Sequence, residues 1–370
     1  MRMLLAGWAL CALALVSPAC AGEVTAGDVK RACDRAANWL IEQHNLGAGT
    51  FGKGKLAQSP GVVALVIKAL AGSPRQYREP HGPFMTQPVK YLLSTQQDSG
   101  AFMQAGHDTY NTALAVLALQ ALQNKNHDTP IDQGRLYLAK CQTKDGGFTY
   151  GDGFRHGGDL SNTWFGLSGL RTAGGKREDA LNAKAVVFIR RCQDNLETNP
   201  DIEARQGENS GGAYYKPGAS EVGTLKTRTG AEVPKPYGSM TAAALDAYLH
   251  AGLKADAPEV KAALRWFSVH FSAKENPGAG ATGYFYYTWA VSRALAAAGV
   301  KEIDLAAAEG KPASKVNWAK ALAEQLLEIQ DKATGSFVNK DSRWGEDDAV
   351  LCTAYTLQSL SQCYQVLSAK

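Results

Sequence analysis

The stretch that decides the fold is residues 142–170, QTKDGGFTYGDGFRHGGDLSNTWFGLSGL, which reads as one complete structural repeat. It begins at the end of an amphipathic helix, continues as a glycine-rich loop, and ends as an almost wholly apolar helix. Gly146 permits backbone angles that are closed to other residues, so the ring of Phe148 can fill the space between the two helices. The stretch therefore predicts a helical hairpin.

The same layout recurs along the chain. Gln, Gly and an aromatic residue stand at matching positions in three places: Gln96-Gly100-Phe102, Gln142-Gly146-Phe148 and Gln330-Gly335-Phe337. A polar group follows each of them, and it is expected where the second helix begins: Asn111-Thr112, Asn162-Thr163 and Thr353. Weaker copies occupy residues 39–51, 188–215 and 266–285. Periodicity on this scale predicts about six repeat units.

The two helices of each unit differ in polarity. In the first helix, residues such as Leu322, Leu326 and Ile329 repeat at helical spacing, which indicates one buried face. The second helix is apolar nearly all round, as in TALAVLALQAL, and suits a position that is packed on both sides. The sequence therefore predicts an all-α (α/α) toroid of about six helical hairpins in two concentric rings. Residues 197–236 and 299–314, rich in Gly, Pro, Lys and Glu, are expected to be loop insertions.

The N-terminal segment has the features of a secretory signal peptide. Arg2 gives a positive start, residues 4–16 form an apolar run too short to span a bilayer, and Ala19-Cys20-Ala21 resembles a cleavage site. We therefore expect residues 1–21 to be removed, residues 22–370 to form one toroid domain, and the protein to be secreted or periplasmic. A lipid anchor on Cys20 is the alternative, disfavoured because Ser17 stands where a lipobox has an aliphatic residue. No second stretch has membrane-spanning length.

Composition excludes some partners. The 39 basic and 35 acidic residues nearly balance, which gives no electrostatic basis for binding nucleic acid. The five cysteines beyond residue 21 form no CxxC pair, so a structural zinc is not expected. Buried free thiols are predicted instead: Cys33, Cys141, Cys192, Cys352 and Cys363. No motif for another cofactor was found, and none is expected.

The repeats resemble those of a known superfamily, the squalene cyclases and prenyltransferase β-subunits. The QxxxGxF pattern at Gln96 and Gln142 is similar to the QxxxGxW repeat of the cyclases, with Phe in place of Trp. Residues 145–148, DGGF, and 167–170, LSGL, resemble the prenyltransferase repeat. The resemblance covers most of residues 22–370 and implies the (α/α) toroid fold.

The resemblance also allows the catalytic positions of these enzymes to be compared. The cyclases protonate an alkene with the middle Asp of a DxDD motif, and the matching stretch, residues 108–111, carries Tyr110 at that place. The prenyltransferases hold zinc with Asp, Cys and His, and Asn162 stands at the His position. Neither activity is therefore expected in its standard form. Asp347 and Asp348 form another acidic cluster, about one turn before the helix start expected at Thr353.

A ligand site is predicted at one end of the inner ring. All inner helices begin at that end, so their backbone N–H groups gather there with the loops at residues 151–159 and 339–348. The candidate acid, base or ion-binding residues are Asp108, His156, Asp159, Asp347 and Asp348. The candidate ligand contacts are Tyr110, Asn162, Trp164, Tyr287 and Trp289. The alternative for Asp108, Asp159, Asn111 and Asn162 is that they only cap helices.

Two functions remain compatible with the sequence. The favoured hypothesis is an exported toroid that binds a hydrophobic small molecule, a glycan or a protein at this mouth, without the standard cyclase or zinc prenyltransferase chemistry. The alternative is an active enzyme, similar to a terpenoid cyclase or a polysaccharide lyase, that uses acidic residues at the mouth.

Overall fold

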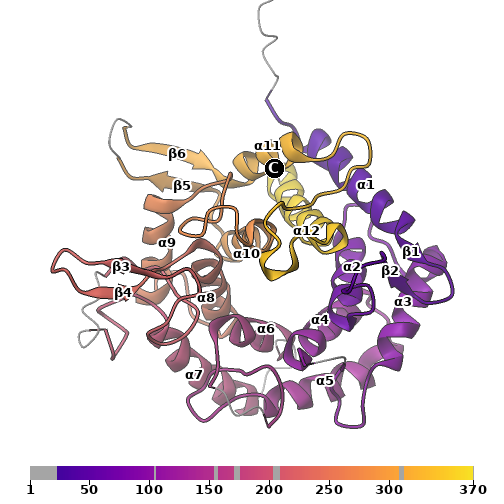
Figure 1. Ribbon diagram of the computed structural model, residues 1–370, viewed down its shortest axis with the longest axis horizontal. Coiled ribbons are helices and arrows are strands. Elements are labelled where there is room, and N and C mark those ends of the chain that lie inside the picture. The colour runs from indigo at the N-terminus through magenta and orange to yellow at the C-terminus, as the bar shows by residue number, and fades with distance from the viewer. Residues whose placement is uncertain are drawn as a thin grey trace, which may run out of the picture.

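The computed structural model describes residues 23–103, 106–153, 157–170, 176–202, 209–307 and 312–369. Over these residues the chain forms twelve α-helices and three two-stranded sheets. The helices lie in two concentric rings (Figure 1). The predicted all-α toroid is confirmed.

Helices of the two rings alternate along the chain. The outer helices are α1 (Ala26–Glu42), α3 (Pro83–Ser94), α5 (Asp128–Lys140), α7 (Lys176–Arg191), α9 (Pro258–His270) and α11 (Trp318–Ile329). The inner helices are α2 (Pro60–Gly72), α4 (Asp108–Ala121), α6 (Leu160–Leu170), α8 (Gly238–His250), α10 (Tyr284–Ala297) and α12 (Ala349–Ser368). Short 3₁₀ turns occur at Glu79–His81, Lys125–His127 and Arg343–Gly345.

The strands form three small antiparallel hairpins. These are β1 (His44–Asn45) with β2 (Thr50–Phe51), β3 (Thr224–Lys226) with β4 (Glu232–Pro234), and β5 (Glu302–Leu305) with β6 (Ser314–Asn317). The hairpin of β3 and β4 lies in the first segment expected to be a loop insertion, residues 197–236. The hairpin of β5 and β6 begins in the second, residues 299–314, and extends beyond it to Asn317, so both segments are partly ordered as strands. Both project from the ring (Figure 1).

The inner ring is closed. Each inner helix packs against the next one along the chain, and α12 packs against α2. The first outer helix, α1, packs against α12 as well, so the two ends of the chain meet at one seam (Figure 1). No helix of the described residues is long and apolar enough to cross a membrane.

Burial follows the predicted polarity of the helices. Every residue of α6 is buried, whereas α11 buries only one face, which includes Trp318, Leu322 and Leu326. The aromatic residues of the repeat loops, such as Phe102 and Phe148, are fully buried between the rings. All five cysteines in the described residues are buried, as predicted, and none of these five is in a disulfide.

A glutamine carboxamide joins neighbouring outer helices in four repeats. Its Nε2 donates to the carbonyl of the loop glycine and to a carbonyl of the next outer helix, at 2.8–3.3 Å. The acceptors are Gly100 and Pro130 for Gln96, Gly146 and Leu181 for Gln142, Gly211 and Glu259 for Gln193, and Gly335 and Ala32 for Gln330. Because Ala32 belongs to α1, the last of these bonds closes the outer ring.

A threonine in the first turns of the inner helices holds the repeat loop. The Oγ1 atoms of Thr112, Thr163 and Thr353 accept the backbone N–H of Phe102, Phe148 and Phe337 at 2.9–3.0 Å. The inner helices begin earlier than expected, at Asp108, Leu160 and Ala349, so each threonine is the fourth or fifth residue of its helix and not the first. The expectation that Asp347 and Asp348 stand one turn before the helix was therefore wrong: they directly precede α12.

The loop glycines allow the outer helices to approach. Gly146 has φ +93°, and a Cβ there would overlap the carbonyl oxygen of Lys184 in α7. Gly252 has φ +94° but nothing within 4 Å of an added Cβ. The two positions thus share a backbone conformation and differ in the space available.

We predict that Gly146→Ala destabilises the protein much more than Gly252→Ala does. The left-handed backbone alone costs an alanine about 1–2 kcal/mol at either position. The overlap with Lys184 adds at least about 2 kcal/mol at position 146, because backbone must move. Chemical denaturation of both variants measures the difference in the free energy of unfolding. Equal decreases in the free energy of unfolding for the two variants would show that the close approach of α7 does not constrain the loop at Gly146.

Candidate mouth site

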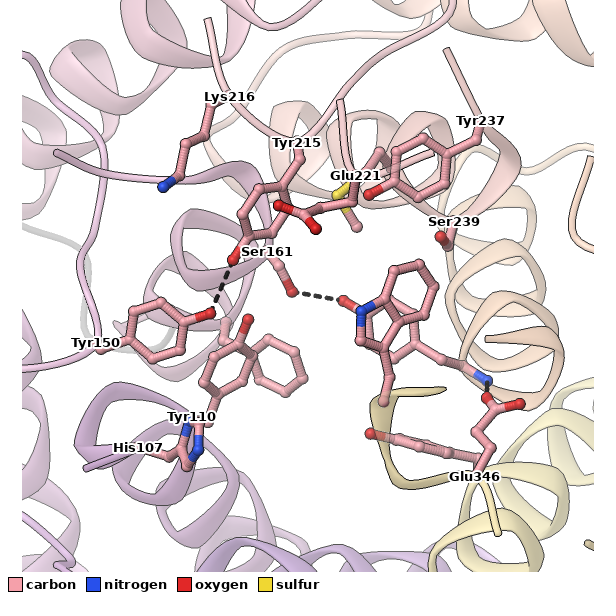
Figure 2. A pocket seen from close by; sticks show the side chains of 15 residues that line it. His107, Tyr110, Tyr150, Ser161, Tyr215, Lys216, Glu221, Tyr237, Ser239 and Glu346 are labelled. Carbon is pink, nitrogen blue, oxygen red and sulfur yellow. Dashed lines mark hydrogen bonds between the residues drawn. The ribbon is translucent and has the colours of Figure 1, made fainter. Parts of the chain in front are cut away.

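A cavity of about 450 Å³ lies at the end of the inner ring where the inner helices begin. Six tyrosines line it: Tyr110, Tyr150, Tyr215, Tyr237, Tyr286 and Tyr355. Phe165 and Trp344 add two further rings. Figure 2 shows the labelled tyrosines, with Ser161, Ser239 and Glu346, around a common space. We call this space the mouth cavity.

The aromatic rings of the mouth cavity pack on one another. Tyr110 meets Phe165 edge-on at 4.7 Å between ring centroids, and Phe165 is stacked with Tyr286 at 6.5 Å. Two hydroxyl pairs satisfy polar atoms: Tyr150 with Tyr215 at 2.9 Å, and Ser161 with Tyr286 at 2.8 Å. Burial raises the pKa of Tyr110 and Tyr286 above the ordinary value, so both phenols are neutral. The cavity wall therefore combines apolar ring surface and neutral hydroxyl groups with three charged side chains, Lys216, Glu221 and Glu346.

Trp344 is held at the rim in an unusual backbone conformation. Its φ of 59° and ψ of 23° are left-handed, and 41% of the residue is exposed. Its ring lies against Gly283, and a Cβ added to that glycine would overlap the ring. The ring is also stacked with that of Tyr237, with 6.4 Å between the ring centroids. The guanidinium of Arg343 lies 4.9 Å from the ring centroid. A bulky residue in this conformation is costly, and such strain is often found at binding sites.

The two segments beside the mouth cavity are joined to each other. Nη2 of Arg343, just before α12, donates to the carbonyl of Glu221 at 2.8 Å and lies 3.2 Å from its carboxylate. Glu221 belongs to the insertion that precedes α8, so the ion pair links segments 122 residues apart. Both groups are nearly half exposed, and the pair contributes little to stability.

Side chains already occupy the helix starts that were expected to face the ligand. The acceptors are Asp159 for the N–H of Asn162 in α6, Asp348 for Leu351 in α12, Glu346 for Tyr286 in α10, Asn276 for Ser239 in α8 and Asn111 for Gly61 in α2. These N–H groups therefore do not need a ligand as acceptor. They are one N–H group in each of five inner helices, and the prediction that a ligand binds at the helix starts stays a prediction.

Asp159 caps α6 and has a carboxyl group with a raised pKa. Its Oδ1 accepts the N–H of Asn162 at 2.8 Å and its Oδ2 accepts the Asn162 side chain at 2.7 Å. The residue is 1% exposed, and burial raises the pKa of its carboxyl to about 6 despite these hydrogen bonds and one from Tyr215. Asn162, which occupies the zinc-ligand position of the resemblance, is fully buried beside it.

The other acidic candidates lie around the mouth cavity without lining it. Asp108 is the first residue of α4, where burial raises the pKa of its carboxyl. Asp348 caps α12, and Asp347 precedes it. His156 falls outside the described residues. Among the described residues, no three His, Cys, Asp or Glu side chains are grouped so that they could hold a metal ion.

Of the five predicted ligand contacts, only Tyr110 lines the mouth cavity. Trp164, Tyr287 and Trp289 are fully buried. The indole of Trp164 donates to Asp246 at 2.7 Å, and the hydroxyl of Tyr287 donates to the carbonyl of Ser272 at 2.9 Å. They point into the core because successive residues of a helix face different directions.

Sequence reasoning missed several residues that line the mouth cavity. Tyr150, Tyr215, Tyr237 and Trp344 come from loops that precede inner helices, and Glu346 precedes α12. Tyr237 directly precedes α8 and Trp344 lies in the turn before α12, and this position was the available signal. Tyr150 and Tyr215 lie farther from the inner helices that follow them, so no such signal marks them.

Comparison with known proteins agrees with this fold. The family description "prenyltransferase alpha-alpha toroid domain" matches residues 1–368, so the chain belongs to that family. A search of curated proteins gives no match.

Solved structures with the same fold include enzymes of two kinds. A variant of the type II terpene cyclase MstE from Scytonema, in complex with geranylgeranyl dihydroxybenzoate, is 15% identical with a TM-score of 0.58, covering 92% of this chain and 98% of that one. The GH76A alpha-1,6-mannanase from Salegentibacter is 10% identical with a TM-score of 0.59, covering 92% and 100%. An inactive variant of that mannanase in complex with alpha-1,6-mannotriose is 8% identical with a TM-score of 0.58, covering 91% and 99%. At these identities the likeness shows the fold alone.

We predict that the free energy of unfolding falls less with rising pH in Asp159→Asn than in wild type. The folded pKa of about 6 lies above the ordinary aspartate pKa of 3.8, so the folded state holds this proton more tightly than the unfolded state. Stability from Asp159 is therefore present below about pH 4 and is lost as pH rises through 6, by at most about 3 kcal/mol.

The test compares the free energy of unfolding of wild type and variant at pH 4.5 and 7.5. Asn caps a helix about as well as Asp, so the variant should be at least as stable as wild type at pH 7.5. Between pH 4.5 and pH 7.5, the free energy of unfolding should fall less in the variant than in wild type. Other carboxyl groups contribute equally to both proteins and cancel in the difference. The same pH dependence in both proteins would contradict the prediction.

Proposed function

We propose that this protein binds a neutral, largely hydrophobic ligand in the mouth cavity. The observation that carries the proposal is the wall itself, in which eight aromatic rings enclose about 450 Å³. Pockets for small molecules are mostly apolar and contain a few polar groups that fix orientation. Tyrosine hydroxyls, Ser161 and Lys216 supply such groups here.

The charges around the mouth cavity favour a neutral ligand over a diphosphate. Lys216 is the lining cation, and the carboxylates of Glu221 and Glu346 line the same space. At the starts of α6, α10 and α12, one backbone N–H group already donates to a side-chain carboxylate. A strongly anionic ligand would therefore have Lys216 as its lining cation and would meet two carboxylates.

The proposal does not assign acid catalysis to the mouth cavity. Tyr110 stands where the related cyclases carry an acid, but its raised pKa makes it a weak proton donor. Both oxygens of Glu346 are already bonded, one to the N–H of Tyr286 and one to the Asn339 side chain. Either group would have to lose packing or hydrogen bonds to react.

The related structures hold two kinds of ligand, which define two candidates. A variant of MstE is bound to geranylgeranyl dihydroxybenzoate, and an inactive variant of the mannanase is bound to alpha-1,6-mannotriose. The enclosed aromatic wall supports an isoprenoid-like ligand. The exposed ring of Trp344 at the rim specifically supports a glycan, because sugar faces stack on such rings. Export through residues 1–21 is part of the proposal and remains a prediction.

We predict that Tyr110→Ala weakens binding of geranylgeraniol at least about tenfold, because one aromatic wall of the mouth cavity is lost. Tyr77→Ala is the matched control: Tyr77 also packs edge-on against a phenylalanine, Phe84 at 5.5 Å, but does not line the mouth cavity. Isothermal titration of wild type and both variants with geranylgeraniol, geranylgeranyl diphosphate and mannotriose measures the affinities.

The alcohol should bind wild type and Tyr77→Ala alike, and more tightly than the diphosphate does. Binding of mannotriose instead of the alcohol would select the glycan candidate. Absence of binding by all three probes, or equal loss in both variants, would contradict a ligand site in the mouth cavity.

A further inference from the structure

A groove of about 730 Å³ adjoins the mouth cavity. Its lining comes from residues 221–235, in the insertion before α8, from residues 275–282, in the turn before α10, and from Arg343, before α12. We call it the side groove. Glu221 lines both the side groove and the mouth cavity, so the two spaces meet at this residue.

The mouth cavity is exposed to solvent beside the side groove. Three of the residues that line the mouth cavity are exposed: His107, Glu221 and Trp344. Glu221 also lines the side groove, and Trp344 directly follows Arg343, which lines it too. A molecule that extends out of the mouth cavity past Glu221 and Trp344 therefore enters the side groove.

The lining of the side groove differs in chemistry from that of the mouth cavity. None of the described residues that line it is aromatic, and four are charged: Glu221, Lys235, Glu275 and Arg343. Two charges of each sign supply hydrogen-bond donors and acceptors without a net charge. A hydroxyl group both donates and accepts hydrogen bonds, so a neutral group with several hydroxyls matches this lining.

Two of these charged side chains are available to a ligand. Within the part of the chain that the structure describes, the side chains of Lys235 and Glu275 make no hydrogen bond or ion pair. The backbone of Lys235 is nevertheless fixed: its N–H donates to the carbonyl of Gly223 at 3.1 Å, and its carbonyl accepts the hydroxyl of Ser220 at 2.7 Å. The ammonium group of Lys235 is thus carried by an ordered segment and can bind a ligand.

The ring of Trp344, at the junction of the two spaces, favours a sugar over a cationic head group. The guanidinium of Arg343 already lies 4.9 Å from the centroid of this ring. A ligand cation placed on the same ring would be repelled by that guanidinium. The apolar face of a sugar ring can stack there without this repulsion.

We propose that the ligand of this protein is a neutral glycolipid, with its hydrocarbon chain in the mouth cavity and its sugar head group in the side groove. Lys235 and Glu275 bind the sugar hydroxyls, and the sugar ring stacks on Trp344. This inference rests on the proposed function, which assigns the site of the chain, and it adds the chemical class of the head group. It joins the hydrophobic and the glycan candidates in one molecule.

The test is isothermal titration of the full chain with three molecules that share one chain and differ in head group: octanol, octyl glucoside and octylphosphocholine. All three are kept below the concentration at which micelles form. We expect octyl glucoside to bind wild type at least about tenfold more tightly than octanol does, because its chain and sugar bind adjoining sites at once. Octylphosphocholine should bind less tightly than octyl glucoside.

Substitutions in the side groove test which residues bind the sugar. Lys235→Met and Glu275→Ala should each lower the ratio of the octyl glucoside affinity to the octanol affinity at least about threefold, because a charged hydrogen-bonding partner is lost. Lys274→Met is the matched control, since Lys274 is exposed and adjacent to Glu275 but does not line the side groove. It should leave the ratio as in wild type.

Three results would overturn the proposal. The first is equal affinity for octanol and octyl glucoside in wild type, and the second is a ratio that neither Lys235→Met nor Glu275→Ala lowers. The third is tighter binding of octylphosphocholine than of octyl glucoside, which would assign the side groove to a zwitterionic head group.

Failure of this proposal is distinguishable from failure of the proposed function. If octanol and geranylgeraniol bind wild type and lose affinity in Tyr110→Ala, but the sugar adds nothing, then the chain site stands and the sugar site is refuted. If neither alcohol binds, the mouth cavity itself is refuted as a site for a hydrophobic chain.

Discussion

The fold depends on a carboxamide that joins two backbone segments at once. In four repeats, a glutamine at the end of an outer helix donates to its own loop glycine and to the next outer helix. A buried carbonyl without a donor is costly, so each of these bonds fixes the distance between neighbouring hairpins. The loop glycine is required because a Cβ would occupy the space of the facing carbonyl. Closure of the ring follows when Gln330 reaches α1.

Ring closure is what creates the mouth cavity. Six inner helices point the same way, so one end of the ring gathers the loops before them and the other gathers the ends of the helices. The fully buried Trp164 and Trp289 fill the space inside the ring. The loops at the mouth contribute aromatic rings, while the opposite end carries charged side chains such as Asp246, Arg293 and Lys301. The two ends of the ring therefore differ in chemistry because the repeats place different residues before and after their inner helices.

The sequence predicted the toroid well because its signals are local and repeated. Gln142, Gly146 and Phe148 each have a short-range physical role, and the same roles recur at matching spacing. The fourth glutamine, Gln193, was missed because 17 residues separate it from Gly211, and the insertion hides the spacing. The helix starts were placed too late because Thr112 and Thr163 resemble caps in sequence but bond to the preceding loop instead.

The site was harder to predict because it depends on the direction in which each side chain points and on contacts between residues far apart in the sequence. Trp164 and Tyr110 both stand near helix starts, yet only Tyr110 faces the mouth cavity. The capping of α10 by Glu346 joins residues 60 apart, and no local pattern indicates it. Asp246 and Arg293 pair across two inner helices in the same way. Such contacts become visible only once the ring is closed.

The central claim is that the mouth cavity is a ligand site for a neutral hydrophobic molecule. A crystal structure of the protein soaked with geranylgeraniol tests it most directly. We expect electron density for the chain of the alcohol inside the mouth cavity, against Tyr110, Tyr286 and Trp344, with the Arg343–Glu221 ion pair beside it. An empty mouth cavity, with the alcohol bound elsewhere on the molecule, would contradict the claim.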